Sequence, residues 1–89
     1  MAFPASPAMA LALEQARDAA ARGEVPVGAV ISDATGRIIA AAGNRTRELA
    51  DPSAHAEMLA IREACAALGS ERLVGCTLTV TLEPCAMCA

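Results

Sequence analysis

The strongest constraint on how this chain folds is a set of residues that can share one metal ion. His55 and Glu57 stand two positions apart, and the segment 84–88, with the sequence PCAMC, supplies Cys85 and Cys88. One imidazole and two thiolates fill three positions of a tetrahedral zinc ion and leave the fourth position open to water. We therefore predict a fold that gathers His55, Cys85 and Cys88 around zinc, with Glu57 beside them as an acid and base.

A closed structural zinc centre would need a fourth protein ligand, and the other cysteines are Cys65 and Cys76. On a helix, Cys65 would lie roughly 15 Å from His55, at about 1.5 Å per residue. In a strand, Cys76 would lie roughly 30 Å from Cys85, at about 3.3 Å per residue. Both spare cysteines are therefore interpreted as small, buried apolar residues.

Two other classes of protein use similar ligands. Two cysteines three positions apart, between a strand and a helix, are also typical of dithiol redox proteins, but that hypothesis gives His55 and Glu57 no role. A non-catalytic zinc-binding fragment is the other possibility. Metal content separates the redox module from a zinc site. The variant Glu57→Ala separates an enzyme, which keeps its metal and loses its rate, from a binding fragment, which loses nothing.

Length, charge and composition limit the possible functions. A chain of 89 residues and 9.0 kDa forms at most one small domain with a thin core, which we expect medium-sized aliphatic side chains to fill. The net charge of −3 and the single aromatic residue, Phe3, give no basic face or stacking surface for nucleic acid. The first residues lack the charged start and long apolar run of a signal peptide, and the sequence has no uncharged apolar stretch of about 18 residues, so we expect a cytoplasmic protein without a membrane span.

Hydrophobic spacing predicts the first elements of the fold. A helix ends near Gly23, and its apolar face carries Met9, Ala12, Leu13, Ala16 and Ala20. Apolar runs at 25–31 and 37–42 predict two strands. The turn sequence DATG at 33–36 joins these strands as a hairpin.

The following residues predict a second helix and a third strand. Asp51, Pro52 and Ser53 resemble a cap before a helix that ends at Gly69, and its apolar face is expected to be Met58, Ile61, Cys65 and Leu68. Residues 77–82 alternate as in a strand, and Pro84 begins a third helix. The order helix, hairpin, helix, strand, helix is typical of α/β layers.

This order of elements explains the spacing of the metal ligands. His55 and Glu57 are two apart, so on the side of a helix they would point to opposite faces, and they can meet only at its N-terminal end. Cys85 and Cys88 are three apart, so both sulfur atoms lie on one face of a first helical turn. Two helix N-termini would then converge on the metal, and their partial positive charge favours thiolate ligands.

From Leu11 onward the chain resembles the bacterial tRNA-specific adenosine deaminases of the cytidine deaminase-like zinc enzymes. The resemblance rests on four segments, which are EVPVGAV at 24–30, GNR at 43–45, DPSAHAE at 51–57 and TLEPCAMCA at 81–89. It implies a three-layer α/β/α fold, of which residues 1–89 are the N-terminal part. It also implies that His55, Cys85 and Cys88 bind zinc and that Glu57 is the acid and base.

The same resemblance implies how a substrate is held. Asn44 would hydrogen-bond the base, although an Asn that follows a strand and a glycine is also typical of a plain turn. Val27, Ala56 and Pro84 would shape the pocket for the base. The implied reaction is hydrolysis of the C6 amine of adenosine at the wobble position of a tRNA anticodon stem-loop, carried out by a homodimer. A free-base or nucleotide deaminase of the guanine or cytosine type is the alternative, because these enzymes share the two zinc motifs.

Length is where the chain departs from this family. Family domains carry two further strands and more helix after the second cysteine, whereas here only Ala89 follows Cys88. A helix that begins at Pro84 would be too short to nucleate well, and the third strand would become an exposed edge. We therefore expect that the 89 residues alone bind zinc weakly and deaminate little or not at all.

Overall fold

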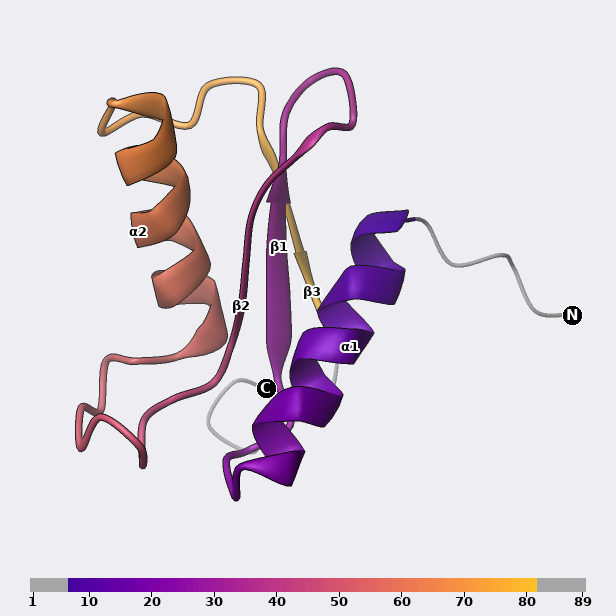
Figure 1. Ribbon diagram of the computed structural model, residues 1–89. Coiled ribbons are helices and arrows are strands. Elements are labelled where there is room, and N and C mark those ends of the chain that lie inside the picture. The colour runs from indigo at the N-terminus through magenta and orange to yellow at the C-terminus, as the bar shows by residue number, and fades with distance from the viewer. Residues whose placement is uncertain (1–6, 82–89) are drawn as a thin grey trace, which may run out of the picture.

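The computed structural model describes residues 7–81, and within them two helices cover the two faces of a small sheet (Figure 1). The elements in chain order are α1 (Pro7–Ala21), β1 (Gly28–Ser32), β2 (Ile38–Gly43), α2 (Ala56–Leu68) and β3 (Thr77–Val80). The strand order is β2-β1-β3, and β1 pairs antiparallel with both neighbours. This confirms the predicted α/β/α layering. The third helix predicted from Pro84 lies outside the described residues.

Two glycines allow α1 to lie close to the sheet. A Cβ atom added to Gly28 would stand 1.9 Å from the backbone oxygen of Ala12, and one added to Gly43 would stand 2.7 Å from that of Gln15. The helix therefore turns small side chains toward the strands, and its buried residues are Ala12, Ala16 and Ala19. The predicted apolar face was wrong at Leu13 and Ala20, which are exposed. The contact leaves no room for a side chain as large as that of Leu13, and the buried face includes Ala19 in place of Ala20.

An alanine stripe also binds α2 to the opposite face of the sheet. The buried residues of α2 are Ala56, Ala60 and Ala64, whereas Met58 and Leu68 of the predicted apolar face are 42% and 47% exposed. Medium-sized aliphatics contribute to the core as expected, since Ile39, Ile61 and Leu73 pack against it, but most of the buried apolar residues in the described part are alanines. Among the described residues, the largest fully buried side chains are Ile31 and Val30 of the central strand. The core is therefore closely packed because small side chains let the helices approach the sheet, and large side chains are not needed to fill it.

Local sequence determines where the elements turn. Gly69 ends α2 as predicted, in the left-handed conformation with a φ of 62°. The predicted hairpin is confirmed, and its turn closes on Asp33. The Asp33 Oδ1 atom accepts hydrogen bonds from the backbone N–H and the hydroxyl of Thr35, at 2.9 and 2.6 Å, and from the N–H of Arg37 at 3.0 Å. This turn is made almost entirely by its own residues.

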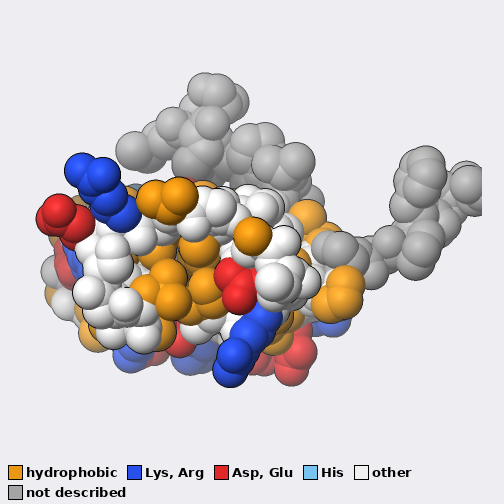
Figure 2. Space-filling view, turned by 90° about the horizontal axis from the view of Figure 1, so that it is seen from above, with side chains coloured by type: hydrophobic (Ala, Val, Ile, Leu, Met, Phe, Trp, Pro, Cys, Tyr) orange, Lys and Arg blue, Asp and Glu red, His pale blue; other side chains and the backbone are white. Residues whose placement is uncertain are grey.

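The two ends of the sheet have different surfaces. We call residues 32–38 the hairpin end, and the opposite end, made by residues 22–28 and 43–57, the site end. Figure 2 looks at the molecule from the hairpin end and shows apolar side chains that reach the surface among charged ones. A hollow of about 500 Å³ there is lined in part by Ile38, Leu68 and Val74.

Neither α1 nor α2 has the length and hydropathy needed to span a bilayer.

The sheet also determines where the chain continues toward its cysteines. Because β3 is antiparallel to β1, the residue that follows β3 lies beside the first residue of β1 at the site end. There Thr81 is buried, its N–H donates to the oxygen of Gly28 at 2.9 Å, and its Oγ1 accepts from the N–H of Gly28 at 3.1 Å. Within residues 7–81, β3 is an edge strand, as predicted.

Candidate functional site

The site end carries His55 and Glu57 at the start of α2, as the spacing of the two residues predicts. His55 occupies the N-cap position with extended backbone angles, and its exposed imidazole makes no capping hydrogen bond. Glu57 lies in the first helical turn and is half-buried. The two side chains therefore stand where the helix dipole is positive, which favours an anionic group nearby.

Asn44 caps α2, in place of the residues that the sequence suggested. The Asn44 Oδ1 atom accepts a hydrogen bond from the N–H of Ala56, the first residue of the helix, at 3.2 Å. The predicted cap at Asp51 to Ser53 was wrong, because Asp51 Oδ1 instead accepts from the N–H and hydroxyl of Ser53, at 2.8 and 2.7 Å. A side chain twelve residues away thus accepts from a free N–H group at the start of the helix. A prediction based on the residues next to the helix does not detect such a cap.

Three of the residues that the family resemblance assigned to the base pocket lie together. The N–H of Asn44 donates to the oxygen of Val27 at 3.1 Å, and the side chain of Asn44 reaches Ala56 on α2. Asn44 is 3% exposed and Ala56 is fully buried. The structure thus joins the end of β2 to the start of α2 at Asn44, directly beside His55 and Glu57. The fourth pocket residue, Pro84, lies outside the described residues.

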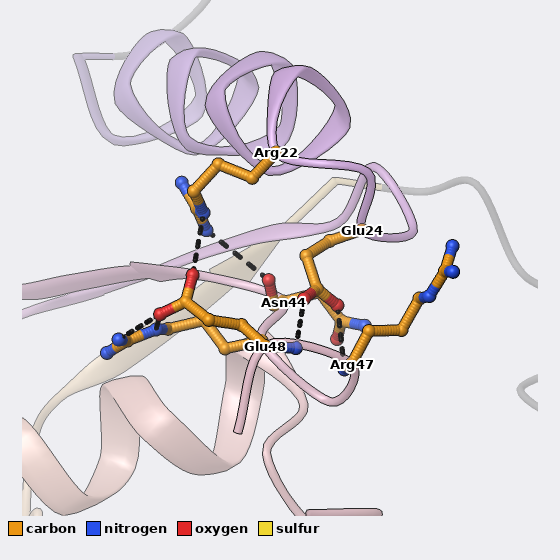
Figure 3. A network of polar contacts seen from close by, with 6 residues as sticks. Arg22, Glu24, Asn44, Arg47 and Glu48 are labelled. Atoms are coloured by element: carbon orange, nitrogen blue, oxygen red, sulfur yellow. Dashed lines mark hydrogen bonds and ion pairs between the residues drawn. The ribbon is translucent and has the colours of Figure 1, made fainter. Parts of the chain in front are cut away.

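A polar network that sequence reasoning missed surrounds Asn44 (Figure 3). Glu24 is 6% exposed, and its two carboxylate oxygens accept from the backbone N–H groups of Arg47 and Glu48, at 3.0 and 2.7 Å. Arg22 donates to the backbone oxygen of Asn44 at 3.3 Å. The one signal in the sequence is a lone carboxylate directly before an apolar strand, and nothing local indicates its partners.

Ion pairs at the surface complete this network. Glu48 contacts Arg22 at 3.3 Å and also pairs with Arg45. The hydrogen bond from the Arg45 side chain, helped by the charges of both arginines, lowers the pKa of Glu48. Because these groups are exposed, solvent screens their attraction, and they add little to stability. A hollow of about 440 Å³ beside the network is lined in part by Arg22, Arg45 and Glu48.

The other predicted metal ligands lie outside the described residues. Cys85 and Cys88 follow Thr81, which is fixed at the site end, so the chain enters the cysteine segment from the correct end of the sheet. Within residues 7–81, no group of three or more His, Cys, Asp or Glu side chains could hold a metal ion. Cys65 and Cys76 are half-buried, and Cys76 packs against the core. Of the three zinc ligands predicted from the sequence, His55 is the one that lies within residues 7–81.

Known proteins resemble this chain along most of its length. Residues 4–89 match the family model of the cytidine and deoxycytidylate deaminase zinc-binding region. The tRNA-specific adenosine deaminase of Agrobacterium fabrum is 63% identical over 81 residues, which cover 91% of this chain and 53% of the relative. The chain spans about half the length of the curated relatives it matches.

Solved structures give the same result. A structure from work on A-to-I editing by tRNA:A34 deaminases at the wobble position matches with a TM-score of 0.82 and 62% identity, over 92% of this chain and 62% of that one. A guanine deaminase from Bacillus subtilis also matches with a TM-score of 0.82, at 39% identity, over 97% of this chain and 55% of that one. These similarities confirm the predicted fold class.

Proposed function

This chain belongs to the cytidine and deoxycytidylate deaminase zinc-binding family, and we propose that it forms the metal-binding part of an enzyme that hydrolyses adenosine in tRNA to inosine and ammonia. The observation that carries the proposal is the start of α2, where His55 and Glu57 flank Ala56, whose N–H is held by Asn44. Relatives named as tRNA-specific adenosine deaminases support the choice of substrate.

His55, Cys85 and Cys88 are the proposed zinc ligands, since one imidazole and two thiolates suit zinc and leave a position for water. Zinc, when bound, supplies the chemistry that brings the pKa of a water molecule near 7. The carboxylate of Glu57 takes the proton that this water loses when its oxygen adds to C6 of the purine. Glu57 would deliver this proton to the ring nitrogen N1, and would then take the proton of the new hydroxyl group at C6 and deliver it to the amine, which leaves as ammonia.

Asn44 is proposed to orient the base. A carboxamide offers two acceptor sites and two N–H donors, and here Oδ1 binds Ala56 while Nδ2 donates to Thr46 Oγ1 at 3.4 Å. One acceptor site and one donor are therefore left for a ligand. Val27, Ala56 and Pro84 are proposed to shape the walls of the pocket around the ring.

The proposed substrate in the cell is the anticodon stem-loop of a tRNA, which implies a cytoplasmic protein. We also propose that the complete protein is a homodimer. Light scattering on the product of the complete reading frame that contains residues 1–89 tests this assembly. A monomeric mass at micromolar concentration would contradict it.

The reaction is tested on the same complete reading frame, purified with zinc. We expect it to convert adenosine to inosine in an anticodon stem-loop, measured by mass spectrometry, and to leave free adenine, guanine and cytosine unchanged. Glu57→Gln should retain zinc and lose activity by about 10³-fold, as expected for a general acid and base. The matched control is Glu63→Gln, on the exposed surface of the same helix, which should keep full activity.

The second candidate function is deamination of a free base, which the match to a guanine deaminase favours. Turnover of guanine without turnover of the stem-loop would support it and overturn the tRNA proposal. A protein that carries no zinc and cycles between dithiol and disulfide would instead be a redox module.

A further inference from the structure

Glu24 is a buried carboxylate to which the proposed chemistry gives no role. It lies between α1 and β1, and it is 6% exposed. Burying a carboxylate is costly unless hydrogen bonds replace its water. Both of its oxygens have such partners, which are the backbone N–H groups of Arg47 and Glu48, at 3.0 and 2.7 Å.

These two N–H groups belong to a single helical turn between β2 and α2. The turn is closed by a bond from the N–H of Leu49 to the oxygen of Arg45 at 3.0 Å and by one from the N–H of Asp51 to the oxygen of Thr46 at 3.0 Å. The first N–H groups of a helical turn have no partner within it. Glu24 thus acts as an N-cap that comes from more than twenty residues away, and both of its bonds are charge-assisted.

The turn held by Glu24 is connected to Asn44 through Thr46, and to the segment before β1 through Arg47. Thr46, inside the turn, accepts a hydrogen bond from Asn44 Nδ2 at 3.4 Å. The guanidinium of Arg47 donates to the oxygen of Gly23, next to Glu24, at 3.1 Å. The sticks in Figure 3 show Glu24 and Arg22 reaching from the end of α1 toward this turn and Asn44. The position of the Asn44 carboxamide therefore depends on where Glu24 holds the turn.

We propose that Glu24 is a positioning residue for deamination, which sets the orientation of the Asn44 carboxamide and, through it, the start of α2 between His55 and Glu57. This inference rests on the proposed function for its kinetic consequence. A carboxylate is required because it offers an acceptor to each of the two N–H groups. A glutamine offers one oxygen and turns an NH₂ group toward the other N–H, while an aspartate is one methylene shorter.

The test compares Glu24→Gln with the matched control Glu48→Gln in the complete reading frame loaded with zinc. Glu48→Gln removes the ion pairs to Arg22 and Arg45 but keeps the backbone N–H that Glu24 binds. In the Glu24 variant we expect KM for the anticodon stem-loop to rise about tenfold while zinc content is unchanged. The control should stay within about twofold of the parent.

A double-mutant cycle with Asn44→Ala determines whether Glu24 acts through Asn44. If it does, the double variant has the kcat/KM of Asn44→Ala alone. Multiplied effects of the two substitutions would overturn the proposal, because they would show that Glu24 acts elsewhere.

A measurement independent of activity separates this inference from the proposed function. Amide hydrogen exchange at Arg47 and Glu48 should become about tenfold faster in Glu24→Gln, and the side-chain NH₂ resonances of Asn44 should shift. Neither change is expected in Glu48→Gln. Unchanged exchange and unchanged Asn44 resonances would refute the inference even in an active enzyme. If the parent has no deaminase activity but the exchange changes as expected, the proposed function is wrong, while the structural role of Glu24 in holding the turn is confirmed.

Discussion

At each end of the sheet a carboxylate accepts hydrogen bonds from a turn, but the two carboxylates differ in how far they lie from that turn in the sequence. At the hairpin end, Asp33 accepts from Thr35 and Arg37, two and four residues further along the chain. At the site end, Glu24 accepts from Arg47 and Glu48, which lie 23 and 24 positions further along the chain. The bonds of Asp33 therefore need only the residues of the hairpin turn, whereas the bonds of Glu24 need the segment before β1 and the segment after β2 to lie together.

This difference has a consequence for function. A turn held by distant partners fixes the relative positions of the elements it joins, so Asn44, His55 and Glu57 are held by the whole packed fold. The turn at the hairpin end is held by its own residues, so its hydrogen bonds to Asp33 do not fix the positions of other elements. We therefore expect substitutions of the same kind to have larger effects at the site end than at the hairpin end.

The largest contrast is expected between two glycines. Gly28→Ala places a Cβ 1.9 Å from the backbone oxygen of Ala12, so α1 must move away from the sheet, and the free energy of unfolding should fall by about 3 kcal/mol. Gly36→Ala at the hairpin end meets no atom within 4 Å and suffers only from its φ of 88°, which should cost about 1 kcal/mol. Chemical denaturation of the two variants measures both values. Equal losses would contradict the contrast.

The next contrast is between the two carboxylates. Glu24→Ala leaves two N–H groups of the turn without their charged acceptor, and we expect a loss of about 2 kcal/mol in unfolding free energy. Asp33→Ala should lose clearly less, because water can reach the exposed N–H groups of the hairpin turn. A larger loss at Asp33, in the same denaturation experiment, would show that local turns hold this fold.

A smaller effect is expected from backbone strain at the end of the site turn. Ala50 has a φ of 48°, a left-handed conformation that costs a residue with a Cβ more than it costs glycine. Ala50→Gly should therefore raise the unfolding free energy by about 0.5 kcal/mol. Ala34→Gly in the hairpin turn, where φ is negative, should lower it by a similar amount. Thermal unfolding of the pair checks the opposite signs.

The smallest effect is a pH dependence at the hairpin end. The hydroxyl of Thr35, followed by the N–H of Arg37, holds the pKa of Asp33 below its ordinary value of 3.8. The unfolded chain takes up a proton near 3.8, while the folded chain still keeps the carboxylate charged. The stability from this bond is complete above that pH and is lost as the pH falls through the lowered value. In Asp33→Asn, the decline of stability below pH 3.8 should be shallower.

The same contrast explains what the sequence could predict. The hairpin, the end of α2 at Gly69 and the place of His55 and Glu57 follow from residues close together in the chain, and all were predicted. Other features depend on contacts between distant segments. They are the cap by Asn44, the bonds of Glu24 to the site turn and the alanine faces of both helices. The hydrophobic pattern placed Leu13 and Met58 inside, whereas the buried faces of α1 and α2 are made of alanines. On α1 the cause is Gly28, which brings the helix backbone so close to the sheet that only small side chains fit between them.

We propose that the site end gathers one nitrogen and two sulfur ligands around a zinc ion that still has a position for water. Zinc K-edge X-ray absorption on the complete reading frame tests this most directly. We expect two sulfur neighbours at about 2.3 Å and two nitrogen or oxygen neighbours at about 2.0 Å, with one sulfur fewer in Cys88→Ser. A site with four sulfur ligands, or a purified protein without zinc, would contradict it.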